Sequence, residues 1–201
     1  MTAGLAAMLT IPASLAAQAN NDHGEVEAYG DLFRVAPTGA SATNFLGLGG
    51  RVSFNTGRFV ALEAEMNYDF EQNYTTVTTL GATTSSTSTT ITSKVRPITA
   101  LFGPKFQLGS SGPLRAFLEA KAGFIDFSTS CNAPAGSTSC FSTSLTNFGG
   151  GTSTHVAMYP GGGIEAFWGP LGFRVDAGDE IYVNNGTYNN LRMTFGPTLR
   201  F

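Results

Sequence analysis

Residues 58–70 read RFVALEAEMNYDF, and this segment decides the fold because its side chains alternate in character. Apolar residues occupy every second position from Val60 to Phe70, whereas the acidic residues Glu63, Glu65 and Asp69 all fall in the other set. Successive side chains of a β-strand point to opposite faces of a sheet. The segment therefore predicts a strand with one apolar face and one acidic face.

The same period of two recurs along the chain between residues that favour turns, and no stretch has a convincing helical period. In the last segment, Leu191, Met193 and Phe195 alternate with Arg192 and Thr194. The pattern predicts an all-β chain with about eight strands, at residues 25–35, 45–54, 58–70, 94–108, 114–127, 153–168, 171–183 and 188–201. Many of these segments reach the roughly 9 to 11 residues with which a tilted strand crosses a bilayer.

The connections between the predicted strands alternate between short and long. Residues 55–57, 109–113 and 169–170 form tight turns, whereas residues 36–44, 71–93 and 128–152 are long and polar. The final connection, at residues 184–187, is shorter than the others on its side. Short turns at one rim and long loops at the other are typical of transmembrane barrels, in which the long loops are extracellular. The sequence therefore predicts an antiparallel, up-and-down transmembrane barrel.

Which face meets water is not decided by alternation, since a soluble barrel would turn its apolar face inward. The charged face here is balanced, with seven acidic and seven basic residues: Glu27, Asp31, Glu63, Glu65, Glu119, Glu165 and Asp176 beside Arg51, Lys105, Arg115, Lys121, Arg174, Arg192 and Arg200. The interior of an eight-strand barrel only just holds side chains. We therefore expect these residues to form ion pairs in the lumen, where inward glycines leave room for the long side chains. We expect all of them except Glu27, Asp31 and Arg200 to belong to one ion-pair network.

Two further observations favour an apolar exterior. Only a closed sheet leaves no unpaired strand edge in hydrocarbon. Phe54, Phe106, Trp168 and Phe201 fall at the predicted strand ends, where an interfacial aromatic girdle would lie.

The composition excludes other classes of protein. Only 12% of the residues are charged, about half of the usual fraction in soluble domains, and no segment after the first twenty residues supplies the ~20 consecutive apolar residues of a membrane helix. The net charge is −3 and the basic residues are dispersed, so nucleic acid is not an expected partner. The pattern indicates no cofactor and no metal site.

The first nineteen residues have the features of a signal peptide. Residues 3–17 form an apolar run too short to span a bilayer, and Ala17-Gln18-Ala19 is the small-x-small pattern of a cleavage site. We expect residues 1–19 to be removed and residues 20–201 to form the barrel, although the usual Lys or Arg at the start is missing. An amphipathic or buried N-terminal helix is the alternative.

Export also bears on the two cysteines, Cys131 and Cys140, which share one Ser/Thr/Gly-rich segment. An oxidising compartment would let them form a disulfide across that loop. Zinc binding is the weaker interpretation, because two thiols without neighbouring His or carboxylate ligands do not make a tetrahedral site.

Taken together, residues 25–201 resemble the eight-strand outer-membrane barrels, the superfamily that includes the transmembrane domain of the outer-membrane protein A family. The resemblance is carried by the leader, the strand count, the difference between the two rims, Gly163-Ile164-Glu165-Ala166-Phe167-Trp168, and Leu199-Arg200-Phe201. It implies that Phe201 is the C-terminal signal recognised by the barrel-assembly machinery. It also implies an integral protein of the bacterial outer membrane, surrounded by lipid.

Three functions are compatible with these patterns. The first is a non-enzymatic, porin-like surface protein with a structural, display or adhesion role and at most a narrow pore, contacting an extracellular partner through loops 71–93 and 128–152. The second is a membrane-embedded enzyme, for which Ser153 and His155 are the candidate nucleophile and base. The third is a secreted, lipocalin-like binder with its apolar face inward. The Thr/Ser tract at residues 75–93 is either an adhesive loop or a flexible solvated one, and Val77, Leu80 and Ile91 hint that strands continue into it.

Overall fold

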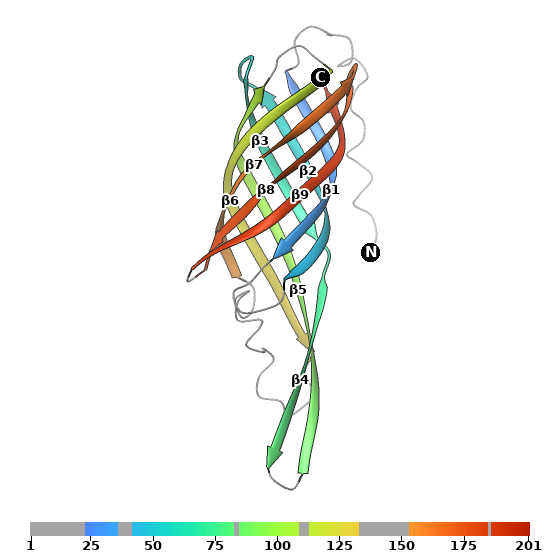
Figure 1. Ribbon diagram of the computed structural model, residues 1–201, viewed down its shortest axis with the longest axis vertical. Helices are drawn as coiled ribbons and strands as arrows, with labels where there is room; N and C mark the ends of the chain where they lie inside the picture. Colours follow the sequence, from blue (N-terminus) through green and yellow to red (C-terminus); the bar gives the residue numbers. More distant parts are fainter. Residues whose placement is uncertain (1–22, 36–41, 83–84, 109–112, 133–152, 185) are drawn as a thin grey trace, which may run out of the picture.

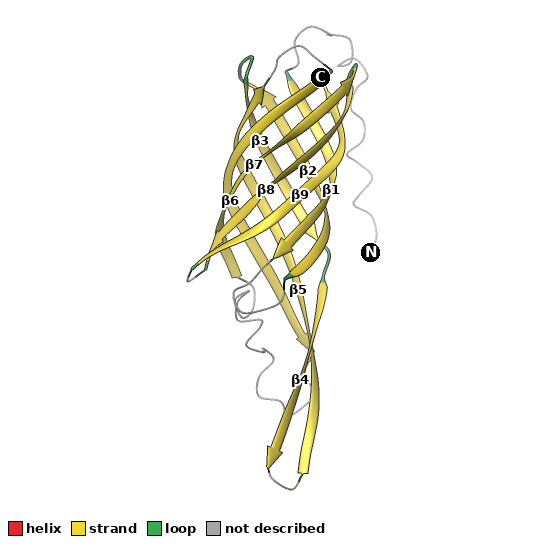
Figure 2. Cartoon of the chain, in the orientation of Figure 1, coloured by secondary structure: helices red, strands yellow, loops and turns green. Residues whose placement is uncertain are grey.

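The computed structural model describes residues 23–35, 42–82, 85–108, 113–132, 153–184 and 186–201. These residues form nine strands: β1 (Gly24–Val35), β2 (Thr43–Asn55), β3 (Val60–Asp69), β4 (Gln72–Ala82), β5 (Ser85–Leu108), β6 (Leu114–Asn132), β7 (Ser153–Trp168), β8 (Leu171–Val183) and β9 (Thr187–Arg200). Figure 2 shows strands and connections only. No helix in the described ranges is long and apolar enough to span a membrane.

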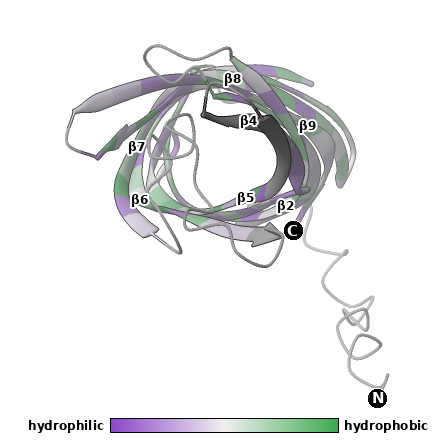
Figure 3. Cartoon of the chain, turned by 90° about the horizontal axis from the view of Figure 1, so that it is seen from below, coloured by the Kyte–Doolittle hydropathy of each residue, from purple (hydrophilic) through white to green (hydrophobic). Residues whose placement is uncertain are grey.

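Eight of the nine strands close into a barrel. Each strand pairs antiparallel with its neighbours in the order β3-β2-β1-β9-β8-β7-β6-β5, and pairing between β3 and β5 completes the ring. Figure 1 shows the tilted strands from the side, and Figure 3 shows the closed ring along its axis. This arrangement confirms the predicted all-β, up-and-down barrel.

The two ends of the barrel differ as the connections predict (Figure 1). One end, called here the short-turn end, carries the β2–β3, β5–β6 and β7–β8 connections together with Phe201. The β7–β8 turn is Gly169-Pro170, in which Gly169 has φ +65°, a conformation that favours glycine. Phe201 lies beside the start of β1, where its carbonyl accepts hydrogen bonds from the His23 and Gly24 amides at 2.8 and 3.0 Å. The opposite end is called the long-loop end.

The segment at residues 71–93 differs from the prediction, because most of it is not a loop. Residues 72–82 form β4, which pairs from Gln72↔Val95 to Ala82↔Ser85 with the first part of β5. This hairpin extends β5 far beyond the long-loop end of the ring (Figure 1). The alternation of Val77, Leu80 and Ile91 was a real strand signal, so the interpretation of the tract as a flexible loop is wrong. Residues 128–132, also expected in a loop, lie in β6.

A β-bulge marks the base of this hairpin. Along β5 the register changes between Tyr68↔Ile98 and Gln72↔Val95, so that three residues of the β3–β4 side oppose two residues of β5. One of those two is Pro97, which has no backbone N–H to give to the ladder. A bulge bends and twists its strand, and here it separates the barrel strand β3 from the projecting strand β4.

The outer wall of the barrel is apolar. Among the large outward side chains, Leu48 is 59% exposed, and Met66 and Phe102 are each 57% exposed. Phe54, Phe106 and Trp168 are also exposed beside the short turns, as expected of an aromatic girdle. So large an exposed apolar surface is unusual for a protein in water.

Candidate functional site

The inward faces of the eight barrel strands fill the lumen, and many of their side chains are charged. Among the described residues it holds ten buried carboxylates and six buried cations: Glu25, Glu27, Asp31, Glu63, Glu65, Asp69, Glu119, Glu165, Asp176 and Glu180 with Arg51, Lys105, Arg115, Lys121, Arg174 and Arg192. The expected balance of seven and seven is therefore wrong, since the formal excess is four negative charges. Arg200 lies at the short-turn end instead, where it donates to the Gly169 carbonyl at 2.9 Å.

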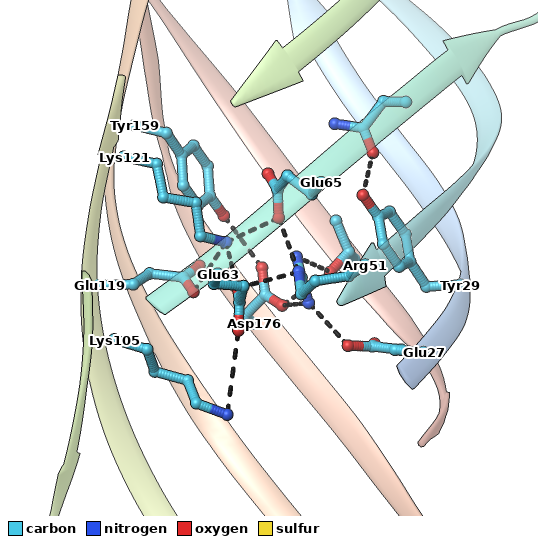
Figure 4. A network of polar contacts seen from close by, with 12 residues as sticks. Glu27, Tyr29, Arg51, Glu63, Glu65, Lys105, Glu119, Lys121, Tyr159 and Asp176 are labelled. Carbon is cyan, nitrogen blue, oxygen red and sulfur yellow. Dashed lines mark hydrogen bonds and ion pairs between the residues drawn. The ribbon is translucent and has the colours of Figure 1, made fainter. Parts of the chain in front are cut away.

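Most of these groups form one network, which we call the central network (Figure 4). Arg174 on β8 is its main cation, with guanidinium nitrogens 2.8 Å from Glu63 and 2.6 Å from Glu119. The same guanidinium lies 3.3 Å from Glu165 and 3.2 Å from Asp176. Because β8 and β3 are on opposite sides of the ring, the Arg174–Glu63 pair crosses the full width of the lumen.

Arg51 on β2 is the second main cation of the central network. It lies 2.8 Å from Glu27, 2.6 Å from Glu65 and 3.0 Å from Asp176, the last of these on β8. Its guanidinium carbon also lies 4.6 Å from the centre of the Tyr29 ring, a cation–π distance. Several carboxylates therefore surround one guanidinium, which is the arrangement that offsets the cost of burying charge.

The lysines connect the remaining acids. Lys121 lies 2.5 Å from Glu63, 2.6 Å from Glu65 and 2.9 Å from Glu119. Lys105 lies 2.6 Å from Glu25 and 2.7 Å from Glu165, which links β5 to β1 and β7. Arg115 contacts the same Glu25 at 3.9 Å.

A separate group, the Arg192 cluster, lies nearer the long-loop end. Arg192 on β9 is 3.2 Å from Asp31 and 3.3 Å from Asp69, and it also pairs with Glu180. One cation thus faces three buried carboxylates. All eleven residues expected in the network make ion pairs, but in two groups rather than one. Glu25, Asp69 and Glu180 were missed, although each has the period-two position of the charged face in its strand.

Between the Arg192 cluster and the long-loop end the lumen becomes apolar, a feature that was not predicted from the sequence. Phe33, Phe45, Ile125, Phe127 and Tyr182 are fully buried there. The Tyr182 ring stacks on Tyr188 at 5.0 Å and meets Phe127 edge-on at 5.2 Å. Their positions follow the charged face of each strand toward the long-loop end, so the pattern was available in the sequence. Aromatic residues near strand ends were instead interpreted only as an outer girdle.

Inward glycines make room for rings more than for long cations. A Cβ on Gly49 would lie 2.3 Å from the Tyr29 ring, and one on Gly178 would lie 2.6 Å from the Tyr159 ring. Real Cβ contacts are not that short. These glycines let the aromatic rings lie flat against the wall, where the Tyr159 hydroxyl donates to Asp176 at 3.0 Å.

The candidate catalytic pair is in contact. His155 Nε2 lies 3.1 Å from Ser153 Oγ, and the His155 ring lies 5.9 and 6.3 Å from the Tyr182 and Phe127 rings. Within the described part of the chain, no carboxylate hydrogen-bonds to His155. The same part contains no group of three or more His, Cys, Asp or Glu arranged to hold a metal.

Two other expectations fall partly outside the described residues. Cys131 lies in β6, but its side chain and all of Cys140 are not described, so the disulfide stays a prediction. Residues 1–22 are not described either, so the signal peptide and its cleavage also stay predictions.

A closed ring of eight strands with charges inside and apolar side chains outside is the architecture of the small outer-membrane β-barrels, and comparison with solved structures shows the same fold. The attachment invasion locus protein Ail of Yersinia pestis, solved with the heparin analogue sucrose octasulfate, has a TM-score of 0.53 at 14% identity, covering 89% of this chain and 99% of that one. Neisserial surface protein A has a TM-score of 0.51 at 10% identity, covering 89% and 97%. No family model and no curated protein matches the chain.

Proposed function

We propose that this protein is an integral barrel of the bacterial outer membrane that displays an uncharged hairpin and loops for surface attachment, without enzymatic activity. The observation that supports it best is the facing of the side chains. Large apolar residues cover the outer wall, whereas sixteen charged residues are buried along the axis. Such an apolar wall is compatible with hydrocarbon. The closed ring also leaves no barrel strand with an unpaired edge there.

The alternative of a soluble, lipocalin-like binder is wrong. Such a barrel needs an apolar cavity for its ligand, whereas ion pairs cross the middle of this lumen and aromatic rings fill its long-loop end. Its exterior would also leave Leu48, Met66 and Phe102 in water.

The attachment role is supported by the extension of β4 and β5 beyond the ring and by its composition. Ail is an attachment protein by its own name, and it was solved with a polyanion. Here, however, residues 72–93 and 128–152 contain neither Lys nor Arg. A sulfated polysaccharide is bound through cations, so we propose an uncharged partner surface for these segments.

A non-enzymatic role is supported by the surroundings of His155. Its ring lies among the Phe127 and Tyr182 rings, and the second ring nitrogen has no orienting carboxylate in the described residues. A catalytic base normally has such a partner. We therefore assign His155 and Ser153 to the packing of the long-loop end.

The fold in a membrane is tested by refolding the full chain in detergent and lipid vesicles. We expect unheated samples to run at a different gel position from boiled ones, and to stay with the vesicles after carbonate washing. A protein that leaves the vesicles in carbonate, with one gel position at either temperature, would contradict the membrane location.

The crossing ion pairs predict that the barrel conducts poorly. We expect the unmodified protein in planar bilayers to show little current. A variant with Glu63→Ala, Arg174→Ala, Phe127→Ala and Tyr182→Ala should show more, because it shortens two side chains that meet across the lumen and removes two rings that fill its long-loop end. The excess of carboxylates should make that current selective for cations. The control is Arg58→Ala at the exposed β2–β3 turn, which should leave the current unchanged. Equal currents in all three proteins would argue against an ion-paired plug.

A further inference from the structure

The projecting strand β4 has one edge that no other described strand covers. In the described residues it pairs only with β5, because the pairing of β2 with β3 ends at Gly47↔Asp69, before β4 begins. In an antiparallel strand, alternate residues direct their N–H and C=O groups to each side, so half of these groups in β4 meet no other strand in the described ranges. Natural edge strands are usually protected by charges, proline or short length. β4 has 11 residues, and Gln72 to Ser93 includes no charged residue and no proline.

The five central residues of β4 read the same in both directions. Val77 is the middle residue of Gln72–Ala82, and it is flanked on both sides by two threonines, giving Thr75-Thr76-Val77-Thr78-Thr79. Two copies of β4 that pair antiparallel about Val77 would place threonine opposite threonine at the two positions on each side of Val77. Threonine pairs across strands are favourable, and a two-fold interface requires a surface that is complementary to itself.

The membrane decides where the second copy must be. Copies in one membrane share one orientation, so their β4 strands point the same way and could pair only in parallel. Antiparallel pairing requires the second copy to be inverted, and therefore to sit in a facing membrane. The symmetry of Thr75–Thr79 about Val77 matches the antiparallel arrangement and gives no advantage to the parallel one.

We propose that β4 binds the β4 of a second copy of this protein in a facing membrane, as an antiparallel pair centred on Val77. The inference rests on the proposed membrane location and gives the uncharged attachment surface its partner. The strand length sets the distance between the two barrels, because 11 residues at ~3.4 Å each span roughly 37 Å.

The test uses full-length protein in phosphatidylcholine vesicles, whose clustering is followed by light scattering. Unmodified protein should cluster vesicles, and bilayers in the clusters should be separated by a gap on the order of 40 Å in electron micrographs. Thr76→Lys with Thr78→Lys should abolish clustering, because Lys then faces Lys across the two-fold axis. Thr76→Glu with Thr78→Glu should abolish it in the same way. Mixing vesicles of the two charged variants should restore clustering, since each Lys then faces a Glu.

The matched control adds the same charge elsewhere at the long-loop end. Ser130→Lys with Asn189→Lys changes exposed positions on β6 and β9, and it should cluster vesicles like the unmodified protein. Failure of the mixed vesicles to cluster would overturn the proposal. So would energy transfer between labelled copies inside single vesicles without any clustering, which would indicate parallel pairing in one membrane. Absence of clustering in a protein that passes the gel and carbonate tests would refute this inference and leave the membrane location intact.

Discussion

Arg174→Met should destabilise the barrel by about 3–5 kcal/mol, the usual effect of removing one partner from a buried ion pair. Methionine keeps much of the side-chain length but removes the charge that lies within 3.3 Å of Glu63, Glu119 and Glu165. Because the lumen already holds ten carboxylates and six cations, losing a cation makes the imbalance worse. Reversible urea unfolding in lipid vesicles, followed by tryptophan fluorescence, measures the effect.

The same reasoning predicts an asymmetry between cations and acids. Glu63→Gln should cost less than Arg174→Met, because it reduces the negative excess, and the cations around it keep other carboxylates. Arg51, for example, retains Glu27 and Glu65. Arg58→Met, at an exposed turn, is the control and should change the free energy of unfolding by less than about 0.5 kcal/mol. If Glu63→Gln were the more costly variant, the assignment of an acid-rich lumen would be wrong.

Met66→Arg should cost about 2–4 kcal/mol, because it places a charge on the lipid-facing wall away from both ends of β3. Its neighbours in register are Gly50 and Ala100, which are too small to shield an arginine from hydrocarbon. Leu108→Arg is the matched control, since Leu108 is also 57% exposed but ends β5 at the short-turn rim. There the expected cost is about 0–1 kcal/mol.

The comparison of these two variants separates a membrane barrel from a soluble one. In water both side chains would be equally exposed, so both substitutions would be nearly silent. Equal unfolding free energies for Met66→Arg and Leu108→Arg in vesicles would therefore contradict a wall that faces lipid.

The sequence was sufficient for the ring because period-two alternation is a local signal that each strand carries by itself. Glu63, Arg174 and Arg192 could be placed inside from their strands alone. Which acid pairs with which cation could not be predicted in this way. Arg174 and Glu63 come from strands far apart in the chain, and strand tilt and register set their relative positions along the barrel axis. The separation of the Arg192 cluster from the central network follows from those positions along the axis.

The hairpin was missed for a different reason. Residues 72–93 are rich in Thr and Ser, which suit turns as well as strands, and apolar positions are sparse in the segment. Threonine also favours strands through its branched Cβ. The pairing of β4 with the first part of β5 shows that the segment forms strands and not a loop.

The central claim is that the apolar face of the barrel lies in hydrocarbon and the charged face lies inside, and fluorescence of single-tryptophan variants tests it most directly. With Trp168→Phe removing the only native tryptophan, Phe102→Trp places the probe on the outer wall and Phe117→Trp places it in the lumen, where Phe117 is 2% exposed against Arg174. We expect lipids brominated on their acyl chains to quench Phe102→Trp strongly and Phe117→Trp weakly. Strong quenching of the lumen probe, or none of the outer one, would contradict the account.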